Sequence, residues 1–231
     1  MEFHKPKPWH SAPELLKEVA IIVIGVLITL SADQAVQWLH VQREVAEARE
    51  ALHDEIAANA TIALFSIEED RCLTKSLDQY VRWAQGGPRA GAFRAGGFPY
   101  LRSSAWEEVR SGPVTHMPLK ERLQLAEYYD EVRNQLTAID LERNAYRPLV
   151  AIDQKSQLSA TDAQRLLEDV AEARLFGFVR TGNGRGLLAS TKAMNVEPHH
   201  LGEPSRRLMA FACFEPGSQP PRPSDFFRPG T

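Results

Sequence analysis

The longest run of apolar residues lies close to the N-terminus of the chain. Residues 19–32 are fourteen positions without a charged side chain, bounded by Lys17 and Glu18 before them and by Asp33 after them. As a helix this run spans about 21 Å, which is shorter than the ~30 Å hydrocarbon core of a bilayer. Apolar positions on both sides extend the stretch to residues 15–39, about 37 Å of helix, which is long enough to cross a membrane.

Such a run is typical of a membrane anchor, of a signal peptide or of a buried helix in a soluble domain. A signal peptide has a positively charged segment before its apolar core and an extended cleavage site after it. Here the lysines before the run are offset by three acidic residues, Glu2, Glu14 and Glu18. The helical pattern also continues through Ser31-Ala32, the small-residue pair where cleavage would occur, and Trp9 and Trp38 flank the run as interfacial tryptophans do. We therefore expect residues 15–39 to be an uncleaved anchor whose partner is the lipid bilayer.

The charges beside the anchor indicate its orientation. Lys and Arg are enriched in the cytoplasmic segments next to membrane spans. Three lysines lie on the N-terminal side of the apolar run and two arginines on its C-terminal side within about 20 residues: Lys5, Lys7, Lys17, Arg43 and Arg49. This small excess predicts a short cytoplasmic N-terminus, residues 1–14, and a C-terminal domain outside the cytoplasm. In a bacterial inner membrane that domain is periplasmic.

Beyond the anchor the pattern changes to the three- and four-residue spacing of an amphipathic helix. The apolar stripe consists of Trp38, Val41, Val45, Ala48, Leu52, Ile56, Asn59 and Ala63. The opposite face is predicted to be charged and consists of Arg43, Glu44, Glu47, Arg49, Glu50, Asp54 and Glu55. No Pro or Gly interrupts residues 26–85, so one long helix should leave the membrane and enter the domain. The stripe fits packing against other helices of the domain, and it also fits a dimeric stalk.

Pro and Gly divide the rest of the chain. Residues 86–100 contain five Gly and two Pro, which predicts a loop. Ser159 and Asp162 fit a capping box that opens a helix. Helices are expected over residues 104–110, from Pro118 to about Arg147-Pro148, from Ser159 to about Val179 and over residues 186–195. One side of the second of these should be lined by Leu119, Leu123, Ala126, Tyr129, Leu136 and Ile139.

No segment alternates as a β-strand does, so the predicted fold is mainly α. A transmembrane helix continues into a long helix, which packs into a bundle of about four to five helices. Residues 40–214 form this helical extracytoplasmic domain. The last segment, residues 215–231, contains five Pro and is expected to be a disordered tail.

Composition excludes several classes of protein. The chain has 231 residues, of which 43% are hydrophobic and 25% charged, close to globular averages. These values exclude a disordered chain and a membrane protein with many spans. The formal net charge of -3 gives no basic excess, so nucleic acid is not an expected partner. The negative mean hydropathy describes the part of the chain outside the bilayer and does not exclude the anchor.

No motif assembles a catalytic, cofactor or metal site. Gly182-Asn-Gly-Arg-Gly186 lacks the spacing of the dinucleotide and nucleotide loops, and we interpret it as a helix break. Cys72 and Cys213 either form a disulfide outside the cytoplasm or remain separate thiols. The other candidates are interpreted as a charged helix face (Glu68-Glu69-Asp70), a solvated loop (His199-His200), packing aromatics (Trp106, Tyr128-Tyr129) and two loop arginines too few to define a ligand (Arg89, Arg94).

Residues 17–38 read KEVAIIVIGVLITLSADQAVQW, and residues 43–59 read REVAEAREALHDEIAAN. These segments resemble bacterial single-pass membrane proteins of unknown function that have an N-terminal IGVLIAL-type anchor followed by a long charged helix. Ser104-Ala-Trp-Glu, Met117-Pro and Tyr128-Tyr129 also resemble segments of such proteins, whereas Thr29 stands where Ala is common. The resemblance implies an anchor and a long helix, and it supplies no catalytic residue.

These patterns predict a single-pass membrane protein with a helical extracytoplasmic domain. We expect a structural, scaffolding or sensory role through binding of a protein partner or a second copy, because the anchor is continuous with a helix and no catalytic group is assembled. The alternative is a membrane-tethered enzyme or small-ligand-binding protein with a pocket near the glycine-rich loops. Enzymatic activity is uncertain, and no cofactor is predicted.

Overall fold

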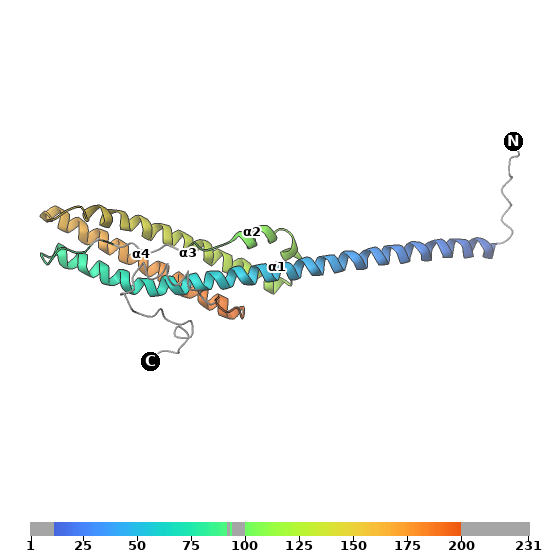
Figure 1. Cartoon of the computed structure of the whole chain (residues 1–231). Coiled ribbons are helices and arrows are strands. Elements are labelled where there is room, and N and C mark those ends of the chain that lie inside the picture. The colour runs from blue at the N-terminus through green and yellow to red at the C-terminus, as the bar shows by residue number, and fades with distance from the viewer. Residues whose placement is uncertain (1–11, 92, 94–99, 200–231) are drawn as a thin grey trace, which may run out of the picture. The chain divides into compact units, whose positions relative to one another are not determined.

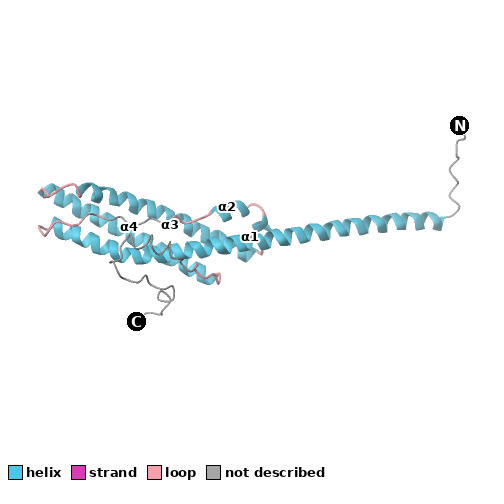
Figure 2. Ribbon diagram, in the orientation of Figure 1, coloured by secondary structure: helices cyan, strands magenta, loops and turns pink. Residues whose placement is uncertain are grey.

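A computed structural model describes residues 12–91, 93 and 100–199 of the chain (Figure 1). Its elements, in order, are α1 (Ala12–Ala84), α2 (Ser104–Val109), a short 3-10 helix η1 (Pro113–His116), α3 (Leu119–Ile152) and α4 (Ala160–Ala193). The described residues contain no strand, which confirms the mainly α prediction (Figure 2). The chain divides into two compact units, Met1–Glu47 and Ala48–Thr231.

The first unit contains the apolar part of α1. Among the described residues, α1 is the helix long and apolar enough to cross a membrane, and none of its apolar window is buried. The side chains from Val19 to Leu30 are exposed all around the helix, and so is Trp38. The Thr29 and Ser31 hydroxyls donate to the carbonyl oxygens of Gly25 and Leu27, at 2.9 and 2.7 Å. α1 continues without a break to Ala84, as the absence of Pro and Gly predicted.

The second unit is a bundle in which α3 and α4 pack with the second half of α1. Buried positions along α4 recur at alternating steps of four and three: Leu166, Val170, Ala173, Gly177, Arg180, Gly184, Leu187 and Thr191. This is the spacing with which helices in coiled coils and bundles face one another. The stripe of α1 from Ala48 to Ala63 is buried in the same core, which confirms the packing interpretation for that stretch.

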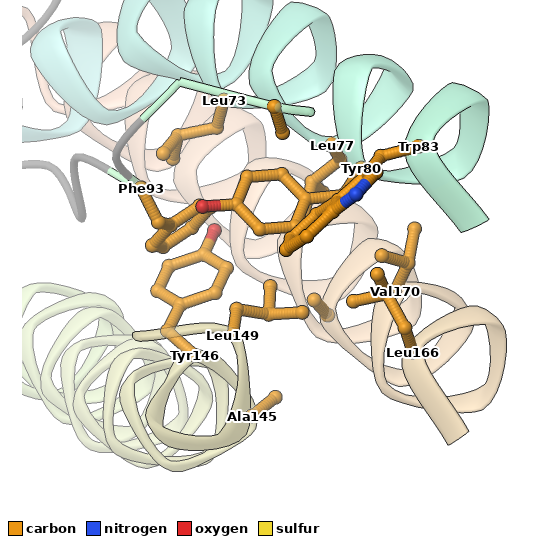
Figure 3. Packing of buried hydrophobic residues seen from close by; sticks show 12 residues of the cluster. Leu73, Leu77, Tyr80, Trp83, Phe93, Ala145, Tyr146, Leu149, Leu166 and Val170 are labelled. Carbon is orange, nitrogen blue, oxygen red and sulfur yellow. The ribbon is translucent and has the colours of Figure 1, made fainter. Parts of the chain in front are cut away.

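An aromatic cluster fills one end of the bundle (Figure 3). The Phe93 ring packs between Tyr80 of α1 and Tyr146 of α3, with ring centroids 5.6 and 4.9 Å away. Leu73, Leu77, Trp83, Ala145, Leu149, Leu166 and Val170 complete the cluster from the three long helices. The described part of the glycine-rich loop, including Ala90 and Phe93, is thus part of the core.

The structure corrects the predicted end of α3. The helix was expected to end near Arg147-Pro148, but it continues through Pro148 to Ile152. Proline in a helix interior costs about 3 kcal/mol, because it removes one hydrogen bond and its ring crowds the preceding turn. Leu149 is fully buried in the next turn, and Ile152 packs against the aromatic cluster. The free energy gained by burying this last turn therefore outweighs the cost of placing Pro148 inside the helix.

The predicted break in α4 is also wrong, since the helix runs through all four glycines between Gly177 and Gly186. Gly177 and Gly184 are buried where α4 approaches α1 and α3, whereas Gly182 and Gly186 have open space beside them. Glycine lowers helix propensity by about 1 kcal/mol per residue, which tertiary packing of a long helix can offset. The capping box at Ser159 and Asp162 is present as predicted.

The buried face of α3 differs from the predicted stripe. Leu119 and Leu123 are 61% and 60% exposed, whereas Gln135 and Glu142 are buried. Glu55 of α1, expected on the charged face, is also buried. The apolar pattern alone misses Glu142 and Glu55 because their partners, Arg180 of α4 for the first and Tyr129 of α3 for the second, come beside them only in the folded bundle.

Candidate functional site: a polar centre in the bundle

The middle of the bundle contains a polar centre around the guanidinium of Arg180. Arg180 Nε donates to Glu142 Oε2 of α3, and Arg180 Nη1 donates to the Ser66 carbonyl oxygen of α1 at 2.6 Å. Tyr146 Oη donates to the other carboxylate oxygen of Glu142 at 2.5 Å. Arg180 is 2% exposed and Glu142 is fully buried. Together, Arg180 and Glu142 connect the three long helices through charge-assisted hydrogen bonds.

The pKa values of Arg180 and Tyr146 are both raised in this centre. Burial lowers the pKa of Arg180, but the attraction of the Glu142 carboxylate and its hydrogen bond raise it, and the net direction is upward. Burial and the Glu142 carboxylate both raise the pKa of Tyr146, so its hydroxyl stays protonated and donates. A buried ion pair of this kind adds little net stability, whereas removing one partner leaves an uncompensated charge in the core.

A second carboxylate borders the centre on its solvent side. Asp70 Oδ1 of α1 lies 3.9 Å from Arg180 Nη2, and the Asp70 side chain is about one-third exposed (33%). Among the described residues, Arg180 Nη2 and Gln135 Oε1 are buried without a hydrogen-bond partner. Asp70 therefore belongs to the charged helix face predicted for Glu68-Glu69-Asp70 and also lies close to the Arg180 guanidinium.

Gly177 lets α4 approach this centre closely. A Cβ atom at Gly177 would lie 3.1 Å from Glu142 Oε1 and 3.4 Å from Asp70 Oδ1. The first distance is tighter than an ordinary contact, and Glu142 is held by hydrogen bonds on both oxygens. Glycine is therefore favoured here by the limited space and not by its backbone conformation.

Glu55 forms a second buried polar site near the start of the bundle. Its carboxylate accepts hydrogen bonds from the Ala105 and Trp106 amides, at 2.9 and 3.3 Å, and from Tyr129 Oη at 2.8 Å. Burial and this carboxylate raise the pKa of Tyr129. The Trp106 and Tyr129 rings stack with centroids 4.9 Å apart, so both are packing aromatics, as predicted. Glu55 thus fixes the first turn of α2 to α1.

The described part of the glycine-rich loop is held by Asp153 and Arg89. The Asp153 carboxylate accepts from Tyr80 Oη and from the Phe93 amide, the latter at 2.6 Å. Arg89 donates to the carbonyl oxygens of Asp153 and Lys155, at 2.5 and 3.0 Å, where α3 ends. The Arg89 guanidinium also lies 5.9 Å from the centre of the Trp83 ring. Arg89 therefore stabilises the contact between this loop and the end of α3.

The other residues singled out in the sequence are not brought together. His199 Nε2 lies 3.2 Å from the Asp54 carbonyl oxygen, and Cys72 is half-buried on α1. Cys213, His200 and Arg94 lie outside the described residues, so both alternatives for Cys72 and Cys213, a disulfide or two separate thiols, stay predictions. In the part of the chain that the structure describes, no group of three or more His, Cys, Asp or Glu side chains could hold a metal ion.

The polar centre was not predicted, since Gln135, Glu142 and Arg180 belong to none of the stripes or candidate sites found in the sequence. The spacing of apolar positions along α4 could have identified Arg180 as a core residue. Extending the buried positions Leu166, Val170 and Ala173 by alternating steps of four and three leads to Arg180. A charged residue on the core register of a bundle helix indicates a buried partner of opposite charge.

Comparison with known proteins adds no relative: no protein-family model, no curated protein and no solved structure matches this chain. The arrangement of charges in the polar centre therefore carries the interpretation. Its hydrogen bonds join α1, α3 and α4 through Arg180 and Glu142.

Proposed function

We propose that the protein is a single-pass membrane protein that acts as a scaffold or sensor by binding a protein partner. Its anchor is residues 15–39, its N-terminus is cytoplasmic, and its helical bundle lies in the periplasm of a bacterium. The proposal joins two features of the chain. One is an apolar helical segment whose side chains are exposed in the part of the chain that the structure describes, and the other is a helical bundle whose central polar groups are hydrogen-bonded to one another.

The exposed apolar segment of α1 is the observation that carries the proposal. Large apolar side chains cover the helix on all sides between Val19 and Leu30, which in water would be an exposed patch larger than soluble proteins tolerate. In lipid the same surface is favourable, and every backbone group is satisfied within the helix. The hydroxyls of Thr29 and Ser31 are bonded to the preceding turn, as hydroxyl groups in lipid need to be.

Membrane extraction tests the anchor. Membranes that contain the full chain are washed with alkaline carbonate, and we expect the protein to stay in the membrane pellet. The variant Ile24→Arg/Leu27→Arg places two charges in the middle of the span and should move a large part of the protein out of that fraction, because each arginine at the bilayer centre costs about 2.5–3.5 kcal/mol. Leu123→Arg, at an exposed apolar position of the bundle, is the matched control and should leave fractionation unchanged.

Reporter fusions test the orientation. Alkaline phosphatase at the C-terminus is active only outside the cytoplasm, and a fluorescent reporter that fails to mature outside gives the opposite readout. We expect an active phosphatase and a dark fluorescent fusion. Release of the wild-type chain by carbonate would contradict the anchor, and a bright fluorescent fusion would reverse the orientation.

A further inference from the structure

One stretch of α1 is covered on the side that faces away from the other two long helices. The positions that face α3 and α4 recur at steps of three and four, as at Ala63, Ser66, Asp70 and Leu73. The opposite side, which we call the α1 outer face, consists of Asp54, Ala58, Thr61, Phe65, Glu68, Cys72, Lys75 and Gln79. Its first member and its last two are exposed, whereas the five between them are buried or half-buried.

The covered stretch includes a charged side chain. Glu68 is only 19% exposed, although Arg71, with which it pairs at 3.5 Å, is 77% exposed. The large apolar side chain of Phe65, one turn earlier, is half-buried. The outward face of a bundle helix is normally solvated, and acidic side chains are seldom covered. The low exposure of Glu68 therefore indicates that another segment of the chain lies over this face.

The chain reaches the α1 outer face soon after α4 ends. The His199 amide donates to the Ala57 carbonyl oxygen at 3.4 Å, and the His199 carbonyl oxygen accepts from Thr61 Oγ1 at 3.2 Å. The His199 ring lies at the same place, with Nε2 3.2 Å from the Asp54 carbonyl oxygen. Because the amide of His199 lies at Ala57 and its carbonyl group at Thr61, one turn further on, the backbone runs there in the direction of α1, toward Cys72.

The sequence that follows His199 contains an apolar segment within reach of this face. Residues 208–214 read LMAFACF, seven positions without a charged side chain, and Arg206 and Arg207 stand directly before them. The segment begins nine residues after His199, a length of chain that can span up to about 30 Å. Removing its large side chains from water is favourable. The two arginines are also complementary in charge to Glu68.

We infer that residues 208–214 dock on the α1 outer face between Thr61 and Cys72, and that Cys213 forms a disulfide with Cys72 there. Cys213 is fourteen residues beyond His199, and Cys72 is eleven residues beyond Thr61, about 17 Å along α1. Fourteen residues cover about 21 Å even as a helix, so Cys213 can reach Cys72 from the contact at Thr61. The C-terminal part of the chain is then joined covalently to α1.

The docking goes beyond the proposed function, and the disulfide rests on it in one respect, because such bonds persist outside the cytoplasm. The bond forms by thiol–disulfide exchange with a disulfide-donating oxidant. One cysteine thiolate attacks the disulfide of the oxidant, and the other thiolate then displaces the remaining oxidant thiol from the mixed disulfide. Two protein thiols become one disulfide, and the oxidant is reduced to two thiols.

Equilibration with glutathione measures how closely the two cysteines are held. The full chain in detergent is incubated at a series of ratios of reduced to oxidised glutathione, and the remaining thiols are labelled with a maleimide that shifts the band on a gel. The ratio at which half of the chains are oxidised gives the effective concentration of one thiol at the other. We expect a disulfide within one chain, which Cys72→Ser and Cys213→Ser each abolish.

The matched control is Cys72→Ser/Ala51→Cys, which moves the partner of Cys213 along α1. Ala51 is exposed, lies on the same side of α1 as Cys72, and is ten residues from Thr61 in the opposite direction. A C-terminal segment without a preferred position would reach both sites equally well. Docking toward Cys72 should instead give an effective concentration at least about tenfold higher for the natural pair. Equal values for the two pairs overturn the inference.

The apolar contact is tested separately from the cysteines. Phe65→Gln removes the large apolar side chain of the α1 outer face and should lower the effective concentration of Cys72 and Cys213 severalfold. Phe178→Gln makes the same change at an exposed position of α4 and should leave it unchanged. An unchanged value in the Phe65 variant contradicts docking on this face.

Other occupants give different results. A disulfide between two chains identifies a second copy as the partner of residues 208–214. An effective concentration that falls when the chain is moved from detergent into vesicles containing phosphatidylglycerol identifies the bilayer as their binding surface. Both outcomes overturn the inference.

Thiol trapping in cells separates this inference from the proposed location. Cells are quenched with acid and labelled with the maleimide, and we expect both thiols to be protected until a reductant is added. Thiols that are reduced in cells but pair as expected in the purified chain support the docking and count against a periplasmic bundle. Thiols that pair in neither sample overturn the docking, whereas carbonate extraction still decides the anchor.

Discussion

One side chain, Arg180 of α4, contacts both other long helices of the bundle. It is buried with Glu142 of α3 and the Ser66 carbonyl group of α1. Removing one member of a buried ion pair leaves the other charge without compensation, which costs about 3–5 kcal/mol. We therefore expect Arg180→Met to lower the melting temperature of the full chain in detergent by about 6–20 °C, measured by circular dichroism.

The matched double variant separates the charge from the packing. Arg180→Met/Glu142→Leu removes both charges and keeps apolar volume, so its loss of stability should be smaller than the sum of the losses for the two single variants. Strictly additive losses would show that the two residues act independently, contrary to the hydrogen bond between them.

Protonation of Asp162 should weaken the N-terminal cap of α4, because Asp162 is part of its capping box. Hydrogen bonds from Lys155 and from Ser159 lower its pKa from the ordinary value of 3.8 to about 2. Because the folded pKa is the lower one, the stabilising effect of the carboxylate is complete above the ordinary value and is lost as pH falls through about 2. An NMR titration should place the Asp162 midpoint near 2, and in the Lys155→Ala variant it should rise toward the ordinary value. Equal midpoints in the two proteins would contradict the role of the lysine.

At the scale of the helix, the two kinds of glycine in α4 should respond oppositely to the same substitution. Gly177→Ala forces a methyl group against Glu142, and overpacking of this kind costs about 1–3 kcal/mol, which exceeds the gain in helix propensity. Gly186→Ala meets open space and should stabilise by up to about 1 kcal/mol. Thermal melts of the two variants, at concentrations where the chain is a single copy, should shift in opposite directions. A stabilising Gly177→Ala would show that Glu142 moves freely.

Pro148 gives a second prediction at this scale. It lies inside α3 and leaves the Asn144 carbonyl oxygen without its helical donor. Replacing it with alanine restores a donor and removes the crowding of the proline ring, while the buried Leu149 and the last turn keep their positions. We expect Pro148→Ala to stabilise the bundle by about 1–3 kcal/mol in urea denaturation. A loss of stability would mean that the last turn of α3 depends on the proline.

These helices also show how far the sequence predicts the fold. Helix existence, the capping box at Ser159 and the uninterrupted α1 follow from local chemistry and were predicted. The end of α3 and the continuity of α4 depend on burial of Leu149 and Gly177 against other helices, which local preferences do not contain. The polar centre is hidden for the same reason, since Arg180 and Glu142 become core residues only when their partners from other helices are in place.

At the scale of the whole molecule, the two compact units predict that the anchor and the bundle fold separately. The buried hydrophobic residues begin at Val45, whereas the side chains of residues 15–39 are exposed. A chain that lacks residues 1–39 should therefore move to the soluble fraction and unfold in one cooperative transition, since its aromatic cluster and its polar centre are intact. Fractionation followed by a thermal melt measures both properties, and the same deletion with Arg180→Met is the control that should melt earlier. Aggregation of the shortened wild-type chain, or a melt without a cooperative transition, would show that the bundle needs the anchor to fold.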